Sequence, residues 1–140
     1  MSALRSRNMS LSGWGNYLRH DCDVYRPEAV LELEEVVRSG ASANVISRGQ
    51  GRSYGDAALN EGEGVILHGR LDRVLGFDRE TGILHCEAGV TLSEVIDLFL
   101  PLGFFPAITP GTKNISLGGA IAAGVVYNAA RISLTERGRE

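Results

Sequence analysis

Several residue classes that often define a function are scarce in this sequence. The 140-residue chain has two cysteines, three histidines, four prolines and one tryptophan. Cys22 and Cys86 could pair, but the N-terminus has no apolar stretch of the signal-peptide type, so we expect two reduced thiols in a cytoplasmic protein. The histidines show no metal-ligand spacing to one another or to the cysteines, which argues against a metal site.

Excess basic charge and long apolar runs are also missing. With 14 basic and 17 acidic side chains the net charge is −3, so we expect no nucleic-acid partner, for which a basic surface would be typical. The most apolar region, residues 98–108, is too short and too broken by proline and glycine to span a bilayer. No Ser-His-Asp or Cys-His arrangement is evident, which fits an enzyme whose cofactor carries the chemistry.

Glycine, in contrast, is abundant, with 18 residues in a chain of otherwise ordinary globular composition. Most of the informative glycines fall in two segments, Ser47–Asp56 and Pro110–Gly124. Glycine allows positive φ and lets a ligand approach the main chain closely. Successive N–H groups in such turns can form a concave anion site. Two such loops indicate a ligand longer than one phosphate, and a dinucleotide is the natural candidate.

The first segment carries polar side chains suited to phosphate. Arg48 and Arg52 supply charge and fork-shaped donors, and Ser53 and Tyr54 supply hydroxyls. The spacing from Gly49 is G-x-G-x-x-x-G and no helical pattern follows, so this is neither a Rossmann fingerprint nor a P-loop. A plain structural turn remains the alternative reading.

The second segment has a similar makeup. Ser116–Gly119 is expected to present a hydroxyl beside two exposed amides, and residues 118–124 are small enough to admit a flat ligand. The alternative is the start of a tightly packed helix. Near the N-terminus, Trp14 stands between two glycines, and we favour a packing anchor there over a ligand contact.

The remaining pattern predicts an α+β fold of short elements. A helix is expected at 27–39, with an apolar stripe and Gly40 as its C-terminal cap, and a second helix opens at the capping box Thr91–Glu94. Five strands are expected, at residues 44–47, 65–67, 73–78, 82–88 and 104–105, of which the third and fourth form a hairpin.

Four motifs in this order resemble one known family. They are Ser47–Asp56, Glu87–Val90, Pro110–Thr112 and Ser116–Ala122. The chain is similar over residues 12–125 to the FAD-binding domain, of the p-cresol methylhydroxylase type, in the vanillyl-alcohol-oxidase family. Within that family it looks most like the decaprenylphosphoryl-β-D-ribose oxidase group and the aldonolactone oxidases.

The resemblance implies the N-terminal part of a two-lobed FAD-binding domain, its C-terminal half missing, from an oxidoreductase acting on CH–OH groups of a sugar, lactone or alcohol. It implies FAD as cofactor, with residues 48–57 around the pyrophosphate, Gly111 and 116–119 at the phosphates and ribityl chain, and 123–125 near the flavin. The candidate cofactor-binding residues are Ser47, Arg48, Gly49, Gln50, Gly51, Arg52, Ser53, Tyr54, Gly55, Asp56, Ala57, Gly111, Thr112, Ser116, Leu117, Gly118, Gly119, Ala123, Gly124 and Val125.

The chain departs from the family after Val125. The family usually continues with a sequence such as His-Gly-Lys-Asn-His, whereas this chain has Val126-Tyr127-Asn128-Ala129-Ala130-Arg131. No catalytic residue can therefore be assigned. We expect a flexible leader at 1–12, a partial FAD-binding domain at 13–125 and a polar tail at 126–140. The alternatives are a non-catalytic nucleotide- or partner-binding module, an inactive truncated remnant, or a half completed by a second polypeptide.

Overall fold

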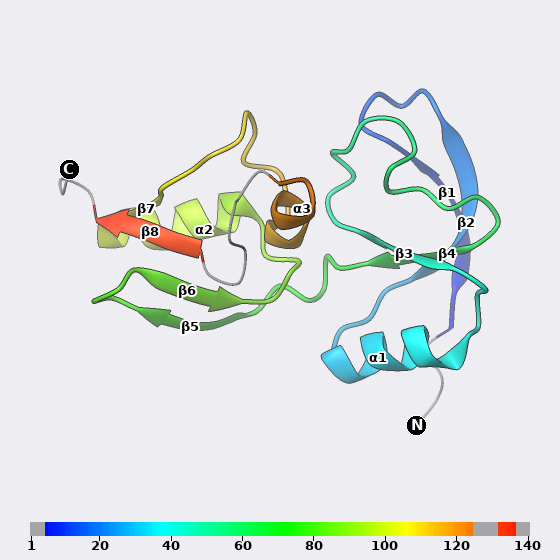
Figure 1. Cartoon of the computed structure of the whole chain (residues 1–140), viewed down its shortest axis with the longest axis horizontal. Coiled ribbons are helices and arrows are strands. Elements are labelled where there is room, and N and C mark those ends of the chain that lie inside the picture. Colours follow the sequence, from blue (N-terminus) through cyan, green and yellow to red (C-terminus); the bar gives the residue numbers. More distant parts are fainter. Residues whose placement is uncertain (1–4, 125–131, 137–140) are drawn as a thin grey trace. The chain divides into compact units, whose positions relative to one another are not determined.

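The chain forms two compact units, Met1–Leu71 and Asp72–Glu140. The structure, a computed structural model, describes residues 5–124 and 132–136, and shows side chains for 5–124 (Figure 1). Each unit contains a four-stranded sheet and at least one helix. This arrangement confirms the α+β class that the sequence predicts.

The first unit is built on a mixed sheet with the strand order β1-β2-β4-β3. Strand β1 is antiparallel to β2, whereas β4 runs parallel to both β2 and β3. Its elements are β1 (Arg7–Ser12), β2 (Arg19–Tyr25), α1 (Val30–Ser39), β3 (Val45–Arg48) and β4 (Gly64–Leu67).

The two faces of this sheet have separate apolar contacts. Because successive strand side chains point to opposite faces, Cys22, Val24 and Val65 form one cluster while Tyr25 and Ile66 belong to another. The second cluster includes the buried Val36 of α1, with Leu33 packed against it, so α1 covers that face. The helix ends as predicted at Gly40, which has a φ of 61°.

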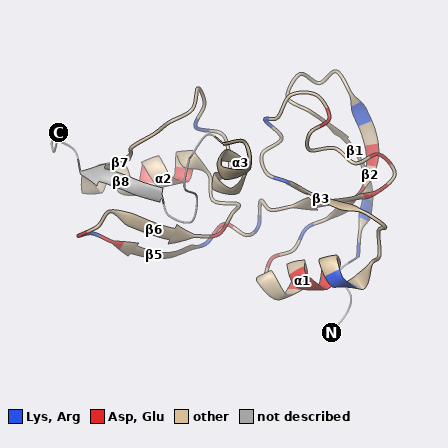
Figure 2. Ribbon diagram, viewed as in Figure 1, with Lys and Arg blue, Asp and Glu red and all other residues tan. Residues whose placement is uncertain are grey.

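The structure differs from the sequence predictions at the start of this unit. Residues 7–12 form β1, so the expectation of a flexible leader is wrong for them, and β2 was not predicted at all. Helix α1 begins at Val30 rather than at residue 27. Two members of its predicted apolar stripe, Val30 and Val37, are 50% and 57% exposed. Acidic and basic side chains also lie along this helix (Figure 2).

The second unit contains an antiparallel sheet with the strand order β5-β6-β8-β7. The predicted hairpin is confirmed as β5 and β6, and the predicted strand at 104–105 as β7. The elements are β5 (Val74–Asp78), β6 (Ile83–Cys86), α2 (Leu92–Phe99), the 3-10 helix η1 (Leu100–Leu102), β7 (Phe104–Pro106), α3 (Leu117–Ala122) and β8 (Ile132–Glu136).

Helix α2 supplies the centre of the second core. The Thr91 hydroxyl accepts a hydrogen bond from the Glu94 amide at 3.2 Å, and the Glu94 carboxylate accepts one from the Thr91 amide at 2.7 Å, which confirms the capping box. Val95 and Phe99 are buried, and the Phe99 ring lies 4.5 Å from that of Phe77. Such tilted aromatic pairs stabilise a core beyond their buried area.

The structure also bears on the cysteines, on membrane-spanning helices and on the predicted tail. Cys22 and Cys86 are both free thiols. Among the described helices, none has the length and apolar character that crossing a bilayer requires. Of the predicted tail at 126–140, residues 126–131 and 137–140 lie outside the described part, and 132–136 form β8.

Candidate cofactor-binding site

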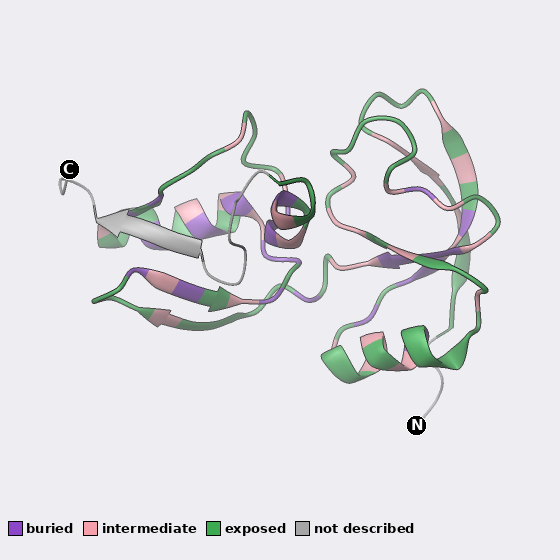
Figure 3. Cartoon of the chain, in the orientation of Figure 1, coloured by how far each residue is buried: buried purple, intermediate pink, exposed green. Residues whose placement is uncertain are grey.

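The first glycine-rich segment forms the connection between β3 and β4. Ser47 and Arg48 end β3, and residues 49–56, here called the amide loop, follow directly. Gly51 and Gly55 have φ values of 64° and 61°, a region that only glycine adopts readily. No helix follows the loop, as predicted, and most of the connection is exposed (Figure 3).

The backbone donors of the amide loop have no acceptors among residues 5–124 and 132–136, which the structure describes. No amide from residue 49 to residue 56 donates a hydrogen bond to any group in the described part of the chain. The carbonyls behave differently, because those of Gln50, Ser53 and Asp56 accept bonds from Arg52, Trp14 and Leu59. A run of N–H groups with no acceptor in the described part of the chain presents positive potential, as anion sites in proteins do.

Arg48 fixes the conformation of this loop through hydrogen bonds to the backbone. Its guanidinium donates from Nη2 to the Ser12 carbonyl at 2.6 Å and from Nη1 to the Ala58 carbonyl at 3.1 Å. Burial lowers the pKa of Arg48 from its ordinary value. A Cβ at Gly51 would overlap this guanidinium. Because two of its donors are engaged with the backbone, Arg48 positions the loop, and Arg52 is the arginine with more donors to offer an anion.

Arg52 lies against the single tryptophan of the chain. Its guanidinium carbon is 4.5 Å from the centroid of the Trp14 ring, and its Nη1 donates to the Gln50 carbonyl at 3.0 Å. Trp14 is 53% exposed, so its packing role consists of this surface contact rather than of burial in the core. No sequence pattern identifies Arg52 as the partner of Trp14.

The other side chains of the first segment are mostly open to solvent. Tyr54 is 80% exposed, and Ser53, Asp56 and Ala57 are exposed as well. Ser47 is exposed too, and its Oγ lies 3.0 Å from Nε2 of His68, the residue after β4. Burial lowers the pKa of His68, so its ring is neutral at pH 7 and adds no charge here.

The second glycine-rich segment begins α3 and does not expose the amides that we expected. The Leu117 amide donates to the Val90 carbonyl at 2.8 Å, the Gly118 amide to the Ala88 carbonyl at 2.9 Å, and the Gly119 amide to the Ser116 hydroxyl at 3.3 Å. The expectation of two exposed amides is therefore wrong, and the alternative of a packed helix start is confirmed. A Cβ at Gly118 would lie 2.8 Å from that of Ala88, which explains the glycine.

Unpaired amides in this region lie earlier in the chain. Gly111 and Thr112 are exposed, and no group in the described residues accepts a hydrogen bond from either amide. Ala123 is the C-terminal cap of α3, Gly124 has a φ of 67°, and Val125 lies outside the described residues. The amide loop belongs to the first unit and this segment to the second, and their roles toward one ligand stay a prediction.

The Glu87–Val90 motif contains a buried acid with a structural role. The Glu87 side chain is 7% exposed and forms an ion pair with Arg73, whose Nη2 lies 2.6 Å from Oε1 of Glu87. The Arg73 amide also donates to Oε2 at 2.8 Å. Hydrogen bonds from the Arg73 side chain hold the pKa of Glu87 below its ordinary value. This ion pair fixes the start of β5 beside the end of β6.

We expect Glu87→Gln to remove part of the acid sensitivity of the second unit. A carboxyl whose pKa is lowered by folding stabilises the fold above its unfolded pKa, and this contribution is lost as the pH falls through the folded pKa. Urea unfolding measured from pH 7 downward gives the slope of the free energy of unfolding against pH. Arg73→Met should flatten it in the same way, whereas an unchanged slope in both variants would contradict the assignment.

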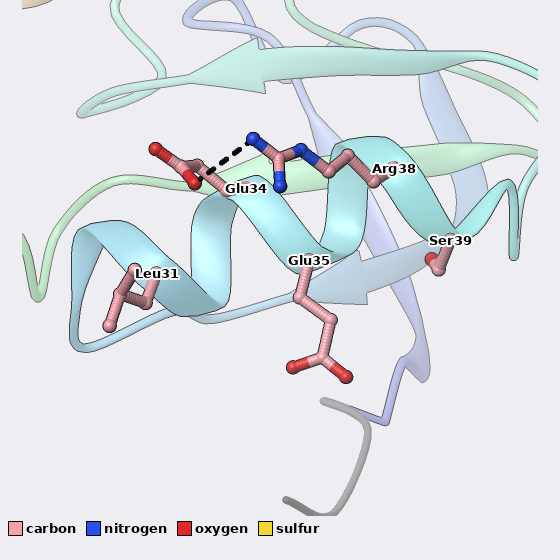
Figure 4. A pocket seen from close by; sticks show the side chains of 5 residues that line it. All are labelled: Leu31, Glu34, Glu35, Arg38 and Ser39. Carbon is pink, nitrogen blue, oxygen red and sulfur yellow. Dashed lines mark ion pairs between the residues drawn. The ribbon is translucent and has the colours of Figure 1, made fainter.

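A hollow of about 450 Å³ beside α1 has a different character (Figure 4). It is lined by Leu31, Glu34, Glu35, Arg38 and Ser39, and an ion pair of 3.4 Å joins Glu34 to Arg38. Its charged side chains are mixed in sign, and none of the predicted site residues lines it. We therefore assign it no role in binding an anionic cofactor.

Comparisons with known proteins show which family the chain resembles. Residues 23–135 match the model of a family described as FAD binding domain. The chain is 34% identical over 118 residues to decaprenylphosphoryl-beta-D-ribose oxidase of Mycolicibacterium smegmatis, covering 82% of this chain and 26% of the relative. The chain thus spans about a quarter of the length of this curated relative.

Two groups of solved structures share the fold at low sequence identity. Cholesterol oxidase from Brevibacterium sterolicum is 17% identical with a TM-score of 0.67, over 87% of this chain and 25% of that one. An alkyldihydroxyacetonephosphate synthase is 22% identical with a TM-score of 0.61, over 76% and 21%.

The sequence match and the family model together define the class of protein. The chain belongs to the family described as FAD binding domain, and its cofactor is FAD. The amide loop fits that cofactor chemically, because a pyrophosphate is an anion that needs several closely spaced donors. The resemblance seen in the sequence is confirmed.

Proposed function

We propose that the amide loop and Arg52 bind the pyrophosphate of FAD. The observation that supports this most is the run of amides from residue 49 to residue 56 without an acceptor in the described chain. Gly111 and Thr112 of the second unit are exposed and have amides of the same kind, and they stay a separate cofactor-binding prediction. Ser47, Arg48 and the α3 residues 116–119 shape the two segments rather than donate to phosphate.

We propose further that the parent reaction oxidises a CH–OH group of a sugar, lactone or alcohol. The name of the 34% identical relative, decaprenylphosphoryl-beta-D-ribose oxidase, supports the CH–OH group of a sugar as the substrate class. FAD, when bound, supplies the capacity to accept a hydride. The residues described here hold and orient the cofactor, and no described residue is assigned a catalytic role.

The chain by itself is proposed to bind FAD without completing turnover. Its match covers 26% of the relative's length, so residues that contact substrate are expected in further polypeptide, whether continuous with this chain or separate. The non-catalytic binding module is the second candidate, and it is favoured by the absence of a recognisable catalytic constellation in the described residues. A cytoplasmic location stays a prediction from the cysteine usage.

The test is the uptake of flavins by the purified chain. Equilibrium dialysis should show binding of FAD, competition by ADP, and no binding of riboflavin, which has the flavin ring but no phosphate. Binding should also raise the unfolding temperature, since the folded state binds selectively. Equal uptake of riboflavin and FAD would contradict a pyrophosphate site.

A second measurement tests whether the chain alone can reduce its flavin with a substrate. Flavin absorbance is followed after a sugar or primary alcohol is added without oxygen. Bleaching by the chain alone would show that it carries the substrate-facing residues, contrary to the proposal. FAD uptake without bleaching is the result that we expect.

A further inference from the structure

We propose that Trp14 is a positioning residue of the cofactor site, which holds Arg52 in place to meet the pyrophosphate. This inference rests on the proposed function and adds to it a segment that the sequence analysis left outside the site. Residues 12–16, here called the Trp14 turn, comprise the end of β1 and the first part of its connection to β2, and they belong to the same unit as the amide loop.

The Trp14 turn is docked on the amide loop at several points. The Trp14 amide donates to the Ser53 carbonyl at 3.0 Å, and Arg48 donates to the Ser12 carbonyl at 2.6 Å. A Cβ at Gly13 would overlap the Gly55 carbonyl, so the two backbones touch there. Because of this close contact, the position of the indole depends on the conformation of the amide loop, and the conformation of the loop depends on the Trp14 turn.

The turn is also rigid in its own right. Asn16 has a positive φ of 56°, and its amide donates to the Gly13 carbonyl at 3.1 Å. Its Oδ1 accepts hydrogen bonds from the Ser12 hydroxyl at 2.7 Å and from Arg19 Nη2 at 2.9 Å. A turn fixed in this way supplies a stable platform for the indole.

The indole acts on Arg52 through its π face. An arginine on an exposed loop samples many rotamers, and ordering it when an anion binds costs conformational entropy. The guanidinium stacked on Trp14 at 4.5 Å, with Nη1 on the Gln50 carbonyl, is ordered before the anion arrives. An exposed cation–π contact of about 0.5–1 kcal/mol corresponds to roughly two- to fivefold in affinity.

The experiment is a double-mutant cycle on the full chain, with FAD dissociation constants as the measurement. We expect Trp14→Leu to weaken FAD binding about threefold in the wild-type background and to have no effect in the Arg52→Gln background. Trp14→Phe should restore most of the affinity, because a phenyl ring also attracts a cation. Tyr17→Leu is the matched control, since Tyr17 is 90% exposed and takes part in none of the contacts described above.

The outcomes separate this inference from the proposed function. Equal losses from Trp14→Leu in both backgrounds would mean that Trp14 only supports the fold, and no loss in either would mean that it does not act on the site. Both results overturn the inference and leave FAD binding intact. A wild-type chain that binds no FAD overturns the proposed function and this inference together.

Discussion

Gly51→Val is expected to abolish FAD binding. Gly51 has a φ of 64°, which a β-branched residue avoids, and its missing Cβ leaves the space that the Arg48 guanidinium occupies. Arg48 cannot simply move away, because it is bonded to the Ser12 and Ala58 carbonyls. The substitution therefore changes the path of the amide loop. Dialysis against FAD measures the effect, and unchanged affinity would contradict the site.

A pair of milder variants separates backbone strain from overlap with Arg48. Gly55 has a similar φ of 61°, but a Cβ there would meet nothing within 4 Å. Gly55→Ala should lower the free energy of unfolding only by the left-handed backbone strain, about 1–2 kcal/mol. Gly51→Ala should lower it by more. In an Arg48→Met background the two alanine substitutions should lower the free energy of unfolding by about the same amount. A persistent difference would mean that another contact excludes a side chain at Gly51.

Arg48→Met is expected to destabilise the first unit by about 3 kcal/mol, from two lost hydrogen bonds to a charged group. The Ser12 and Ala58 carbonyls lose their donor, and the amide loop loses its attachment to β1. FAD affinity should fall as well, because the loop is no longer held in its binding conformation. Urea unfolding of the chain measures the first effect and dialysis the second.

Arg52→Gln is the matched control and should give the opposite pattern. Arg52 lies on the surface, donates to the Gln50 carbonyl of its own loop and stacks on Trp14, so the unfolding free energy should fall by no more than about 1 kcal/mol. FAD affinity should fall by about tenfold to a hundredfold, as expected for one charged hydrogen bond of ~1.5–3 kcal/mol. If Arg48→Met weakened binding without loss of stability, Arg48 would be a ligand of the phosphate instead.

Local signals in the sequence were sufficient for much of the fold. Gly40 ended α1, the Thr91–Glu94 box opened α2, and a polar turn between two apolar runs predicted the β5–β6 hairpin. These features depend on residues within a few positions of one another, so a single sequence contains the whole cause. The first glycine-rich segment was found for the same reason.

Features that depend on distant partners were not predictable in this way. Strand β1 has only Met9 and Leu11 as apolar residues, and its place in the sheet is set by pairing with β2 and by the packing of Val24 and Val65. Strand propensity is weak beside such tertiary contacts. The same holds for the site, because the bonds that make Arg48 a support and Arg52 a donor run to carbonyls and an aromatic ring that the sequence does not place.

The central claim is that backbone amides 49–56 bind the pyrophosphate, and amide NMR of the labelled chain tests it most directly. Adding ADP, and then FAD, should shift the amide signals of residues 49–56 and of Arg52 Nε, while signals of α1 beside the hollow stay in place. Shifts confined to other residues, with the amide loop unchanged at saturating FAD, would contradict the account.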